Sequence, residues 1–364
     1  MPKTSERGLS IMKKVLLING SPKGKNSNTR KLALTFLDGL NKNNQYQIDE
    51  IICSQANIQD CKGCFYCWKN EEGNCSIEDD MQTYLKKYID ADIIVWSFPN
   101  YFHGIPSTAK KFMDRLLPMY YPWLEKKGAA QTEHPCKYDF RNKNIILFCC
   151  CGYYNVNHNT EALRKQFELL YHSYDAVFFP EGQLLANDFL NYYAKDYFSA
   201  LYSAGCEYAA TFKISNESQT ILNKPLLAID QFISYVNTTA IVKSKNMTMQ
   251  EYMLKKERAF FQCMALTYNP SVLQVDQSVL EIQIVDHPYV CQLHLDKKQC
   301  LLVEDKALFL PYRLKVITNL SLFTSRPQLA TATVSKSGQP DFNTLIHLIN
   351  KMEKKGITKE MKLD

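Results

Sequence analysis

The sequence lacks long apolar runs and any concentrated stripe of basic residues. Residues 1–11 are polar and irregular, and the apolar run that follows them is far too short for a signal peptide or a membrane span. The 43 basic and 37 acidic residues are spread along the chain, so the net charge of +6 is expected to favour solubility and not nucleic-acid binding. These absences predict a cytoplasmic protein with no membrane span and no nucleic-acid partner.

Two common nucleotide-binding motifs are also missing from the first loop, which follows an apolar run at residues 15–18. No Gly-Lys-Ser/Thr ends this loop as in a Walker A motif, and the three-glycine dinucleotide pattern is absent. Instead, the segment 14–32, KVLLINGSPKGKNSNTRKL, leads from a strand-like run through a polar loop into residues spaced for a helix.

A loop of this kind is a good seat for a phosphate group. Free backbone amides and the positive end of a helix dipole converge at its tip, while polar side chains add donors and lysines add charge. The candidate phosphate-binding residues are Ser21, Lys23, Ser27, Asn28 and Thr29. The alternative interpretation is an ordinary Ser/Asn cap on a surface helix.

The chain contains thirteen cysteines, which are expected to stay reduced in the cytosol, so a tight cluster of them suggests metal or redox chemistry before disulfides. Cys61, Cys64, Cys67 and Cys75 form such a cluster, spaced C-x2-C-x2-C-x7-C. This spacing can supply the ligands of a cubane iron–sulfur cluster. The alternatives are plain thiols that pack a loop, and a zinc site, which more often takes two well separated C-x2-C pairs. Cys149–Cys151 lie inside an apolar run and are expected to be core residues.

Apolar runs alternate with helical periodicity through the first two thirds of the chain. Strands are expected at residues 15–18, 45–52, 91–97, 143–151 and 176–185, with helices between them and a long helix at 192–212. Strands that alternate with helices require parallel pairing and right-handed crossovers, so the expected fold class is α/β with a doubly wound five-stranded parallel sheet. The length of 364 residues leaves room for a second domain.

The loop after the third expected strand is a candidate ligand site. It consists of Pro99, Asn100, Tyr101, Phe102, His103 and Gly104. Open α/β sheets bind ligands beyond the carboxyl ends of their strands, and aromatic faces beside backbone amides suit a flat heterocycle. His103 is a candidate acid or base, although a lone loop histidine is more often solvated or hydrogen-bonded.

Three motifs occur in the order and spacing of the flavodoxin-like NADPH-dependent FMN reductases. They are NGSPKGKNSNTRKLA, the cysteine run with its trailing DDM, and SFPNYFHGIPSTAKKFMDRL. The cysteines make the chain resemble most the iron–sulfur flavoprotein branch of that family. The resemblance covers roughly residues 13–240, including a tail, AGCEYAATFKISNESQTILNKPLL, that is similar to the end of those proteins.

The resemblance implies a flavodoxin-like fold and an FMN cofactor. Residues 21–29 would hold the FMN phosphate, and residues 99–104 would lie along the isoalloxazine ring, with Cys151, Gly152 and Tyr153 approaching from its other side. The four clustered cysteines match the ligands of a [4Fe-4S] cluster in that branch. The motif helix of those relatives includes the positions of Lys111, Asp114 and Arg115, and its implied role is mostly structural. Relatives commonly associate, so a homo-oligomer is expected.

The last third of the chain has a different character. A polar link near residues 240–250 leads to a helical segment at 255–266, four alternating stretches that predict antiparallel strands, and an amphipathic helix at 341–352. From ALTYNPSVL to SKSGQPDFNTLIHLINKM the sequence resembles the sterol-carrier-protein family, whose sheet and helices enclose an apolar lipid tunnel. Residues 323–340 are shorter than the helical region usual in that family.

The expected organisation is therefore an extension (1–12), an FMN-binding domain (13–212), a tail and linker (213–245) and an α+β domain (246–364). The first functional hypothesis is an FMN-dependent NAD(P)H oxidoreductase that passes hydride to the flavin N5 and then electrons to a quinone, flavin or other small acceptor. The alternative is an FMN or iron–sulfur electron-transfer protein whose last domain binds a lipid or a protein partner. The acceptor and the choice between NADH and NADPH stay open.

Overall fold

The computed structural model describes residues 12–70, 73–171, 173–186 and 191–240, and beyond them parts of 245–266 and five strands between residues 277 and 334. By its internal contacts the chain divides into two units. Unit 1 comprises Met1–Ala186 and Ala194–Leu226, and unit 2 comprises Asn187–Tyr193 and Leu227–Asp364. Within the described part of the chain, no helix combines the length and the apolar character needed to span a membrane.

Unit 1 is built on a five-stranded parallel sheet with the strand order β2-β1-β3-β6-β7. The strands are β1 (Lys13–Asn19), β2 (Tyr46–Ile52), β3 (Ile93–Pro99), β6 (Asn144–Cys150) and β7 (Asp175–Phe179). This order is that of the flavodoxin-like doubly wound sheet, so the predicted fold class is confirmed for this unit. The last predicted strand was too long, because the chain turns at Glu181, which has a φ of 55°, and residues Leu184–Ala186 form a 3-10 helix, η3.

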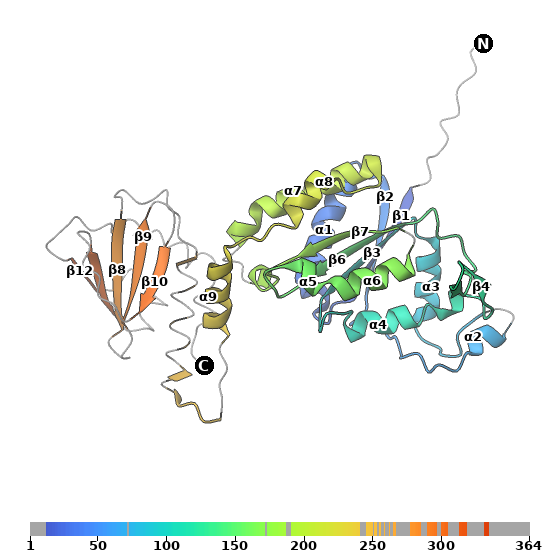
Figure 1. Cartoon of the computed structure of the whole chain (residues 1–364), viewed down its shortest axis with the longest axis horizontal. Helices are drawn as coiled ribbons and strands as arrows, with labels where there is room; N and C mark the ends of the chain where they lie inside the picture. Colours follow the sequence, from blue (N-terminus) through green and yellow to red (C-terminus); the bar gives the residue numbers. More distant parts are fainter. Residues whose placement is uncertain are drawn as a thin grey trace, which may run out of the picture. The chain divides into compact units, whose positions relative to one another are not determined.

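Helices cover both faces of this sheet, as Figure 1 shows. One face carries α1 (Asn28–Leu40), α7 (Asn191–Thr211) and α8 (Asn216–Leu222), and the other carries α3 (Met81–Asp90), α4 (Ser107–Asp114) and α6 (Glu161–Leu170). Successive strand residues point to opposite faces, so Val15 and Leu17 enter one core while Leu16 and Ile18 enter the other. Both faces are covered, which explains why each central strand is an unbroken apolar run.

Helices α1 and α7 approach each other closely at two glycines. A methyl group added at Gly205 would overlap the backbone oxygen of Phe36, and one added at Gly39 would overlap the backbone oxygen of Tyr202. Because each glycine faces the backbone of the opposite helix, neither can take a side chain without moving the helices apart.

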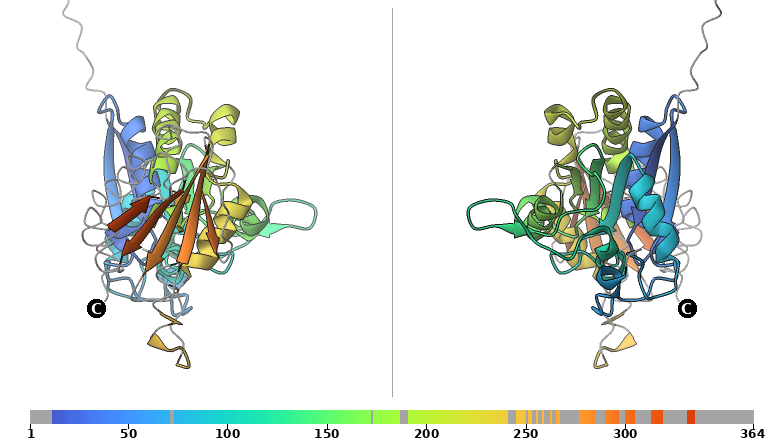
Figure 2. Two further views of the ribbon diagram at one scale, coloured as in Figure 1. Left: turned by 90° about the vertical axis from the view of Figure 1, so that its left-hand side faces the viewer. Right: turned by 90° about the vertical axis from the view of Figure 1, so that its right-hand side faces the viewer.

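Short elements complete unit 1. They are η1 (Gly24–Asn26), α2 (Tyr66–Lys69), η2 (Leu117–Met119), β4 (Glu125–Lys126), β5 (Thr132–Glu133) and α5 (Val156–Asn159). The antiparallel pair β4–β5 forms a hairpin that projects from the body of the unit, most clearly in Figure 2.

Unit 2 contains α9 (Ile229–Thr239) and a second sheet with the order β10-β9-β8-β11-β12. The strands are β8 (Gln277–Ile284), β9 (Val290–Asp296), β10 (Cys300–Glu304), β11 (Arg313–Thr318) and β12 (Thr331–Val334). The predicted antiparallel arrangement is wrong at one place, since β11 pairs with β8 in parallel. Alternating hydrophobicity identifies a strand but not the direction of its neighbour. In the predicted helix 255–266 the described positions are helical, and the predicted helix 341–352 lies outside the described residues.

Candidate functional site

Three predicted loops meet at the carboxyl edge of the parallel sheet, because they follow the neighbouring strands β1, β3 and β6. Backbone hydrogen bonds join them to the adjoining strand ends. The amide of Gly20 donates to the Ser97 oxygen over 2.9 Å, and the amide of Asn100 donates to the Cys150 oxygen over 2.8 Å. The structure therefore brings the candidate phosphate-binding residues, the 99–104 loop and the 151–153 loop to one edge.

The first loop is organised by Asn19, a fully buried residue that the sequence reasoning missed. Its Nδ2 donates to the backbone oxygen of Gly24 over 3.0 Å, and its Oδ1 accepts from the amide of Ser21 over 3.2 Å. Gly24 has a φ of 53°, a left-handed conformation that glycine adopts without strain. In the sequence, the one sign of this role is a polar residue at the end of an apolar strand.

The loop ends at the N-terminus of α1, where Ser27 caps the helix. The Ser27 Oγ accepts a hydrogen bond from the amide of Arg30 over 3.3 Å, which leaves its own hydroxyl proton available to a ligand. The amides of Asn28 and Thr29 lie in the first helical turn, where no intrahelical acceptor exists. Ser21 and Ser27 are buried and Lys23 is exposed, so the loop combines buried hydroxyl donors with a solvent-exposed positive charge.

Two candidate phosphate residues also make contacts elsewhere. The Asn28 Nδ2 donates to the backbone oxygen of Gly182 over 3.2 Å, which ties α1 to the loop after β7. Burial raises the pKa of the Cys150 thiol to about 12, and the hydroxyl of Thr29, which lies beside this thiol, opposes that rise. The Thr29 side chain therefore faces the core, and its backbone amide is the better candidate donor.

The loop after β3 forms a tight two-residue turn. Tyr101 and Gly104 pair through two backbone hydrogen bonds of 3.1 and 2.9 Å, and Phe102 and His103 between them have φ values of 48° and 61°. Turns of this type usually contain glycine or asparagine, because other residues are strained at positive φ. The Phe102 side chain is fully exposed. Strain and an exposed aromatic ring on the same turn are typical of a ligand-contacting segment.

His103 is engaged by neighbouring residues. Its Nδ1 lies 3.2 Å from the backbone oxygen of Asn159, and its ring stacks on Tyr153 with a centroid distance of 5.6 Å and an angle of 11°. The Asn100 Nδ2 donates to the same Asn159 oxygen over 2.8 Å, whereas the buried Asn100 Oδ1 has no partner among the described residues. The 99–104 and 151–153 loops thus form one aromatic surface with an acceptor beneath it.

The loop after β6 is fixed by the loop after β7. The amide of Gly182 donates to the Cys151 oxygen over 2.8 Å, and the Gln183 Nε2 donates to the Gly152 oxygen over 3.1 Å. Burial raises the pKa of the Cys151 thiol, so this side chain stays neutral and packs in the core while Tyr153 is half exposed. Cys149 and Cys150 are buried as well, as predicted for core residues.

The candidate metal ligands lie in the loop between β2 and α3. Cys61, Cys64, Cys67 and Cys75 all line one small cavity, together with Arg115, Leu117 and Pro118, and all four are free thiols. Cys61 and Cys64 are exposed, and Cys67 is buried. Over the described ranges of the chain, no three His, Cys, Asp or Glu side chains are grouped so that they could hold a metal ion.

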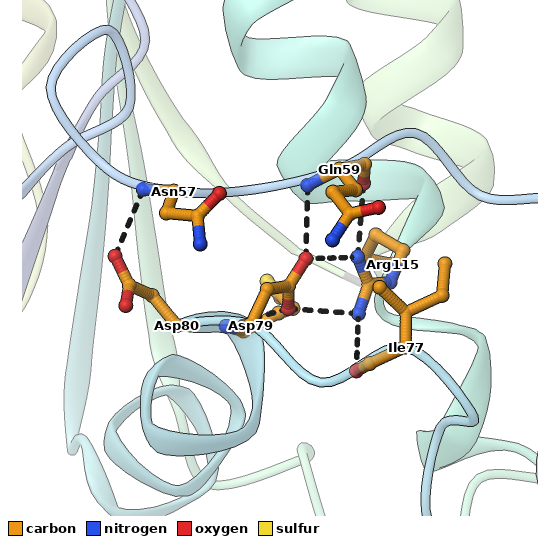
Figure 3. Close-up of polar contacts among 7 residues, drawn as sticks. Asn57, Gln59, Ile77, Asp79, Asp80 and Arg115 are labelled. Carbon is orange, nitrogen blue, oxygen red and sulfur yellow. Dashed lines mark hydrogen bonds and ion pairs between the residues drawn. The ribbon is translucent and has the colours of Figure 1, made fainter.

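A buried ion pair closes this loop. The carboxylate of Asp79 accepts from both terminal nitrogens of Arg115 over 2.7 and 3.0 Å, and both side chains are at most 1% exposed. Figure 3 shows that the pair joins the loop segment at Gln59 to the segment at Asp79. Asp79 also accepts from the Gln59 amide over 2.9 Å, and Arg115 donates to the Gln59 oxygen over 2.9 Å. The loop is therefore fastened to the end of α4.

Burial alone would raise the pKa of the Asp79 carboxyl, but Arg115 and the amides of Gln59 and Met81 outweigh burial and hold this pKa below its ordinary value. The main side-chain partner of Asp79 is Arg115. Asp80 likewise bonds across the loop, to the amide of Asn57 over 2.8 Å. Only the tertiary fold brings these residues together.

A larger cavity of about 640 Å³ lies between α4, α6 and residues 120–141, and the sequence reasoning missed it. Aromatic and aliphatic side chains such as Tyr88, Met113 and Phe140 line it, with charged residues that include Lys110 and Glu133. Among the described residues of the cysteine-bearing loop, Trp68 lines this cavity, and its ring lies 4.8 Å from that of His134.

Comparisons with known proteins agree with the resemblance to the NADPH-dependent FMN reductases, and they do not test the sterol-carrier resemblance of the last third of the chain. Residues 13–189 match the family model of NADPH-dependent FMN reductases. The chain is 36% identical over 108 residues to an iron–sulfur flavoprotein of Methanocaldococcus jannaschii, which is 29% of this chain and 53% of that protein. It is 34% identical over 102 residues to an iron–sulfur flavoprotein of Archaeoglobus fulgidus, which is 28% of this chain and 48% of that protein.

The chain thus spans about half the length of the curated relatives that it matches. Among solved structures, an FMN-dependent NADH-azoreductase from Bacillus anthracis aligns with 55% of this chain and 99% of that chain, at 17% identity and a TM-score of 0.41.

Proposed function

We propose that this chain is an FMN-dependent NAD(P)H oxidoreductase that passes electrons to a quinone, flavin or other small acceptor. One observation carries the proposal: a phosphate-binding type of loop at the N-terminus of α1 and a strained aromatic turn lie at the same edge of a flavodoxin-like sheet. The family match over residues 13–189 supports it.

The proposal assigns a role to each loop. The hydroxyls of Ser21 and Ser27 and the amides of Asn28 and Thr29 would hold the FMN phosphate, with Lys23 adding positive charge. The turn around Phe102 and the side chain of Tyr153 would lie against the ring. When bound, FMN supplies hydride and electron transfer. The protein positions the ring and leaves one face open to nicotinamide, and His103 stays a candidate proton donor.

The four clustered cysteines are proposed as ligands of a [4Fe-4S] cluster. Each thiolate of such a cluster binds a different iron, so the thiols need not converge on a single point. Four thiols around one cavity, spaced C-x2-C-x2-C-x7-C, fit this need better than a zinc site, which more often takes two well separated C-x2-C pairs. Similarity to iron–sulfur flavoproteins supports the same assignment.

Three further parts of the proposal come from the sequence. We propose that unit 2 binds a lipid or a protein partner, as its resemblance to the sterol-carrier family implies, and that the protein forms a homo-oligomer in the cytoplasm. The second candidate function is an electron-transfer protein that uses the same cofactors. Steady NAD(P)H oxidation with added quinone would favour the oxidoreductase, and reduction only by another protein would favour the carrier.

FMN affinity tests the main proposal directly. The protein should bind FMN at least tenfold more tightly than riboflavin, because the phosphate gains charge-assisted hydrogen bonds at the helix N-terminus, each worth about 1.5–3 kcal/mol. Lys23→Gln should weaken binding of FMN but not of riboflavin. Lys42→Gln, which removes an exposed lysine beyond the other end of α1, is the matched control and should change neither affinity. Quenching of flavin fluorescence measures the affinities of the wild type and both variants for FMN and riboflavin. Equal affinities of the wild type for FMN and riboflavin would refute the phosphate site.

A further inference from the structure

We propose that Arg115 sets the reduction potential of the group held by the four cysteines, by directing a buried positive charge toward Cys75. The inference rests on the proposed iron–sulfur function and assigns a role to a residue for which the sequence resemblance implied a structural one. Arg115 follows α4 directly, lines the cysteine cavity and has a side chain only 1% exposed.

The orientation of the guanidinium follows from its hydrogen bonds. Asp79 binds end-on to the two terminal nitrogens, Nη1 and Nη2, and the backbone oxygen of Gln59 also accepts from Nη1. The Nε donor is buried and has no hydrogen-bond partner among the described residues. Buried donors in proteins are nearly always paired, so this one calls for an explanation.

Cys75 is the proposed acceptor for Nε. Arg115 and Cys75 both line the same small cavity, and Nε is the buried donor of Arg115 that lacks a partner among the described residues. A neutral thiol is a weak acceptor, whereas a thiolate ligand carries the charge that makes a hydrogen bond from guanidinium strong. Asp79 binds the guanidinium at Nη1 and Nη2, so the Nε edge is left to face the cysteine cavity with its positive charge.

The expected effect of this charge is specific. Four thiolates concentrate negative charge in the cavity, and one-electron reduction of a cluster adds one more negative charge. A fixed cation beside the cluster favours the reduced state, and it acts strongly because neither Arg115 nor Asp79 is screened by water. Lys62 also lines the cavity but is exposed, so solvent should screen its charge.

The test compares four variants of the full chain with the wild type, each loaded anaerobically with iron and sulfide. Iron and sulfide content and the midpoint potential, followed by electron paramagnetic resonance, are measured for all of them. Arg115→Gln should lower the equilibrium constant for reduction at least tenfold, which is about 59 mV for one electron. Arg115→Lys and Lys62→Gln should stay close to the wild type, and Asp79→Asn, which removes a negative charge, should shift the potential upward.

The opposite signs distinguish an electrostatic role from a structural one, since breaking the loop would move Arg115→Gln and Asp79→Asn in the same direction. A loaded Arg115→Gln protein with the wild-type potential overturns the inference and leaves the proposed cluster standing. If Arg115→Gln takes up no cluster, the midpoint potential of Asp79→Asn decides. A midpoint potential above that of Arg115→Lys supports the inference. A midpoint potential at or below that of Arg115→Lys overturns the inference. A wild type without iron overturns the proposed cluster itself, and this appears in the iron analysis.

Discussion

The Asp79–Arg115 pair is expected to stabilise unit 1 strongly. The Asp79 side chain is fully buried and accepts four hydrogen bonds, two from Arg115 and one each from the amides of Gln59 and Met81. Asp79→Asn keeps the size of the side chain but leaves the guanidinium as a buried charge without its counter-ion. Breaking a buried pair in this way costs about 3–5 kcal/mol of unfolding free energy.

Asp90 offers a matched control at the other end of α3. It pairs with Lys14 over 3.8 Å, and both side chains are more than half exposed, so Asp90→Asn should change the unfolding free energy by no more than about 1 kcal/mol. Urea unfolding followed by tryptophan fluorescence is a suitable assay, because all three tryptophans, Trp68, Trp96 and Trp123, belong to unit 1.

With a urea dependence of about 2 kcal/mol per molar, the midpoint for Asp79→Asn should fall by about 1.5–2.5 M. Equal midpoints for Asp79→Asn and Asp90→Asn would show that water or a rearranged loop compensates the charge, and would refute the reasoning.

Acid pH provides a second test of the same pair. The pKa of Asp79 is lowered in the folded protein, so its contribution to stability is fully present above the unfolded pKa of about 3.9 and is lost as the pH falls through the folded pKa. The difference between wild type and Asp79→Asn should therefore be constant near neutrality and shrink below about pH 4. A difference that grows on acidification would contradict the sign of this pKa shift.

Two further substitutions test local geometry. Gly205→Ala should lower the unfolding free energy of unit 1 by about 1–3 kcal/mol in the same urea assay, because the new methyl group would overlap the Phe36 oxygen. The control Ser203→Ala, on the exposed side of α7, should be nearly neutral. Phe102→Gly should cost little stability, since relief of about 1–2 kcal/mol of left-handed strain offsets the entropy of glycine, yet it should weaken FMN binding. Phe65→Gly, at a φ of 55° in the cysteine-bearing loop, is the control and should leave FMN affinity unchanged.

The five parallel strands could be predicted because their signal is local. A strand buried on both faces needs an unbroken apolar run such as residues 15–18, and alternation with helices then determines parallel pairing. The positions of the candidate ligand loops followed from the same logic, since neighbouring strands end at one edge of the sheet.

The interactions that shape the sites could not be predicted in this way. Asp79 and Arg115 lie 36 positions apart, and nothing in the local pattern pairs them. Asn19 looked like the end of a strand, although it holds the following loop through two hydrogen bonds. In unit 2, the parallel pairing of β8 with β11 depends on the path of the chain between them and not on the alternation within either strand.

Helix α4 connects the two candidate redox sites of unit 1. At its first turn, the Thr108 hydroxyl donates to the Gly20 oxygen, and Ala109 packs so closely on Gly20 that this position cannot take a side chain. After its last turn, Arg115 reaches the cysteine cavity. A helix of eight residues is about 12 Å long and rigid, so it fixes the distance between the phosphate loop and the cysteines. The rate of electron transfer between two cofactors in one chain depends on their separation, and α4 can hold that separation constant only while both of its ends remain packed.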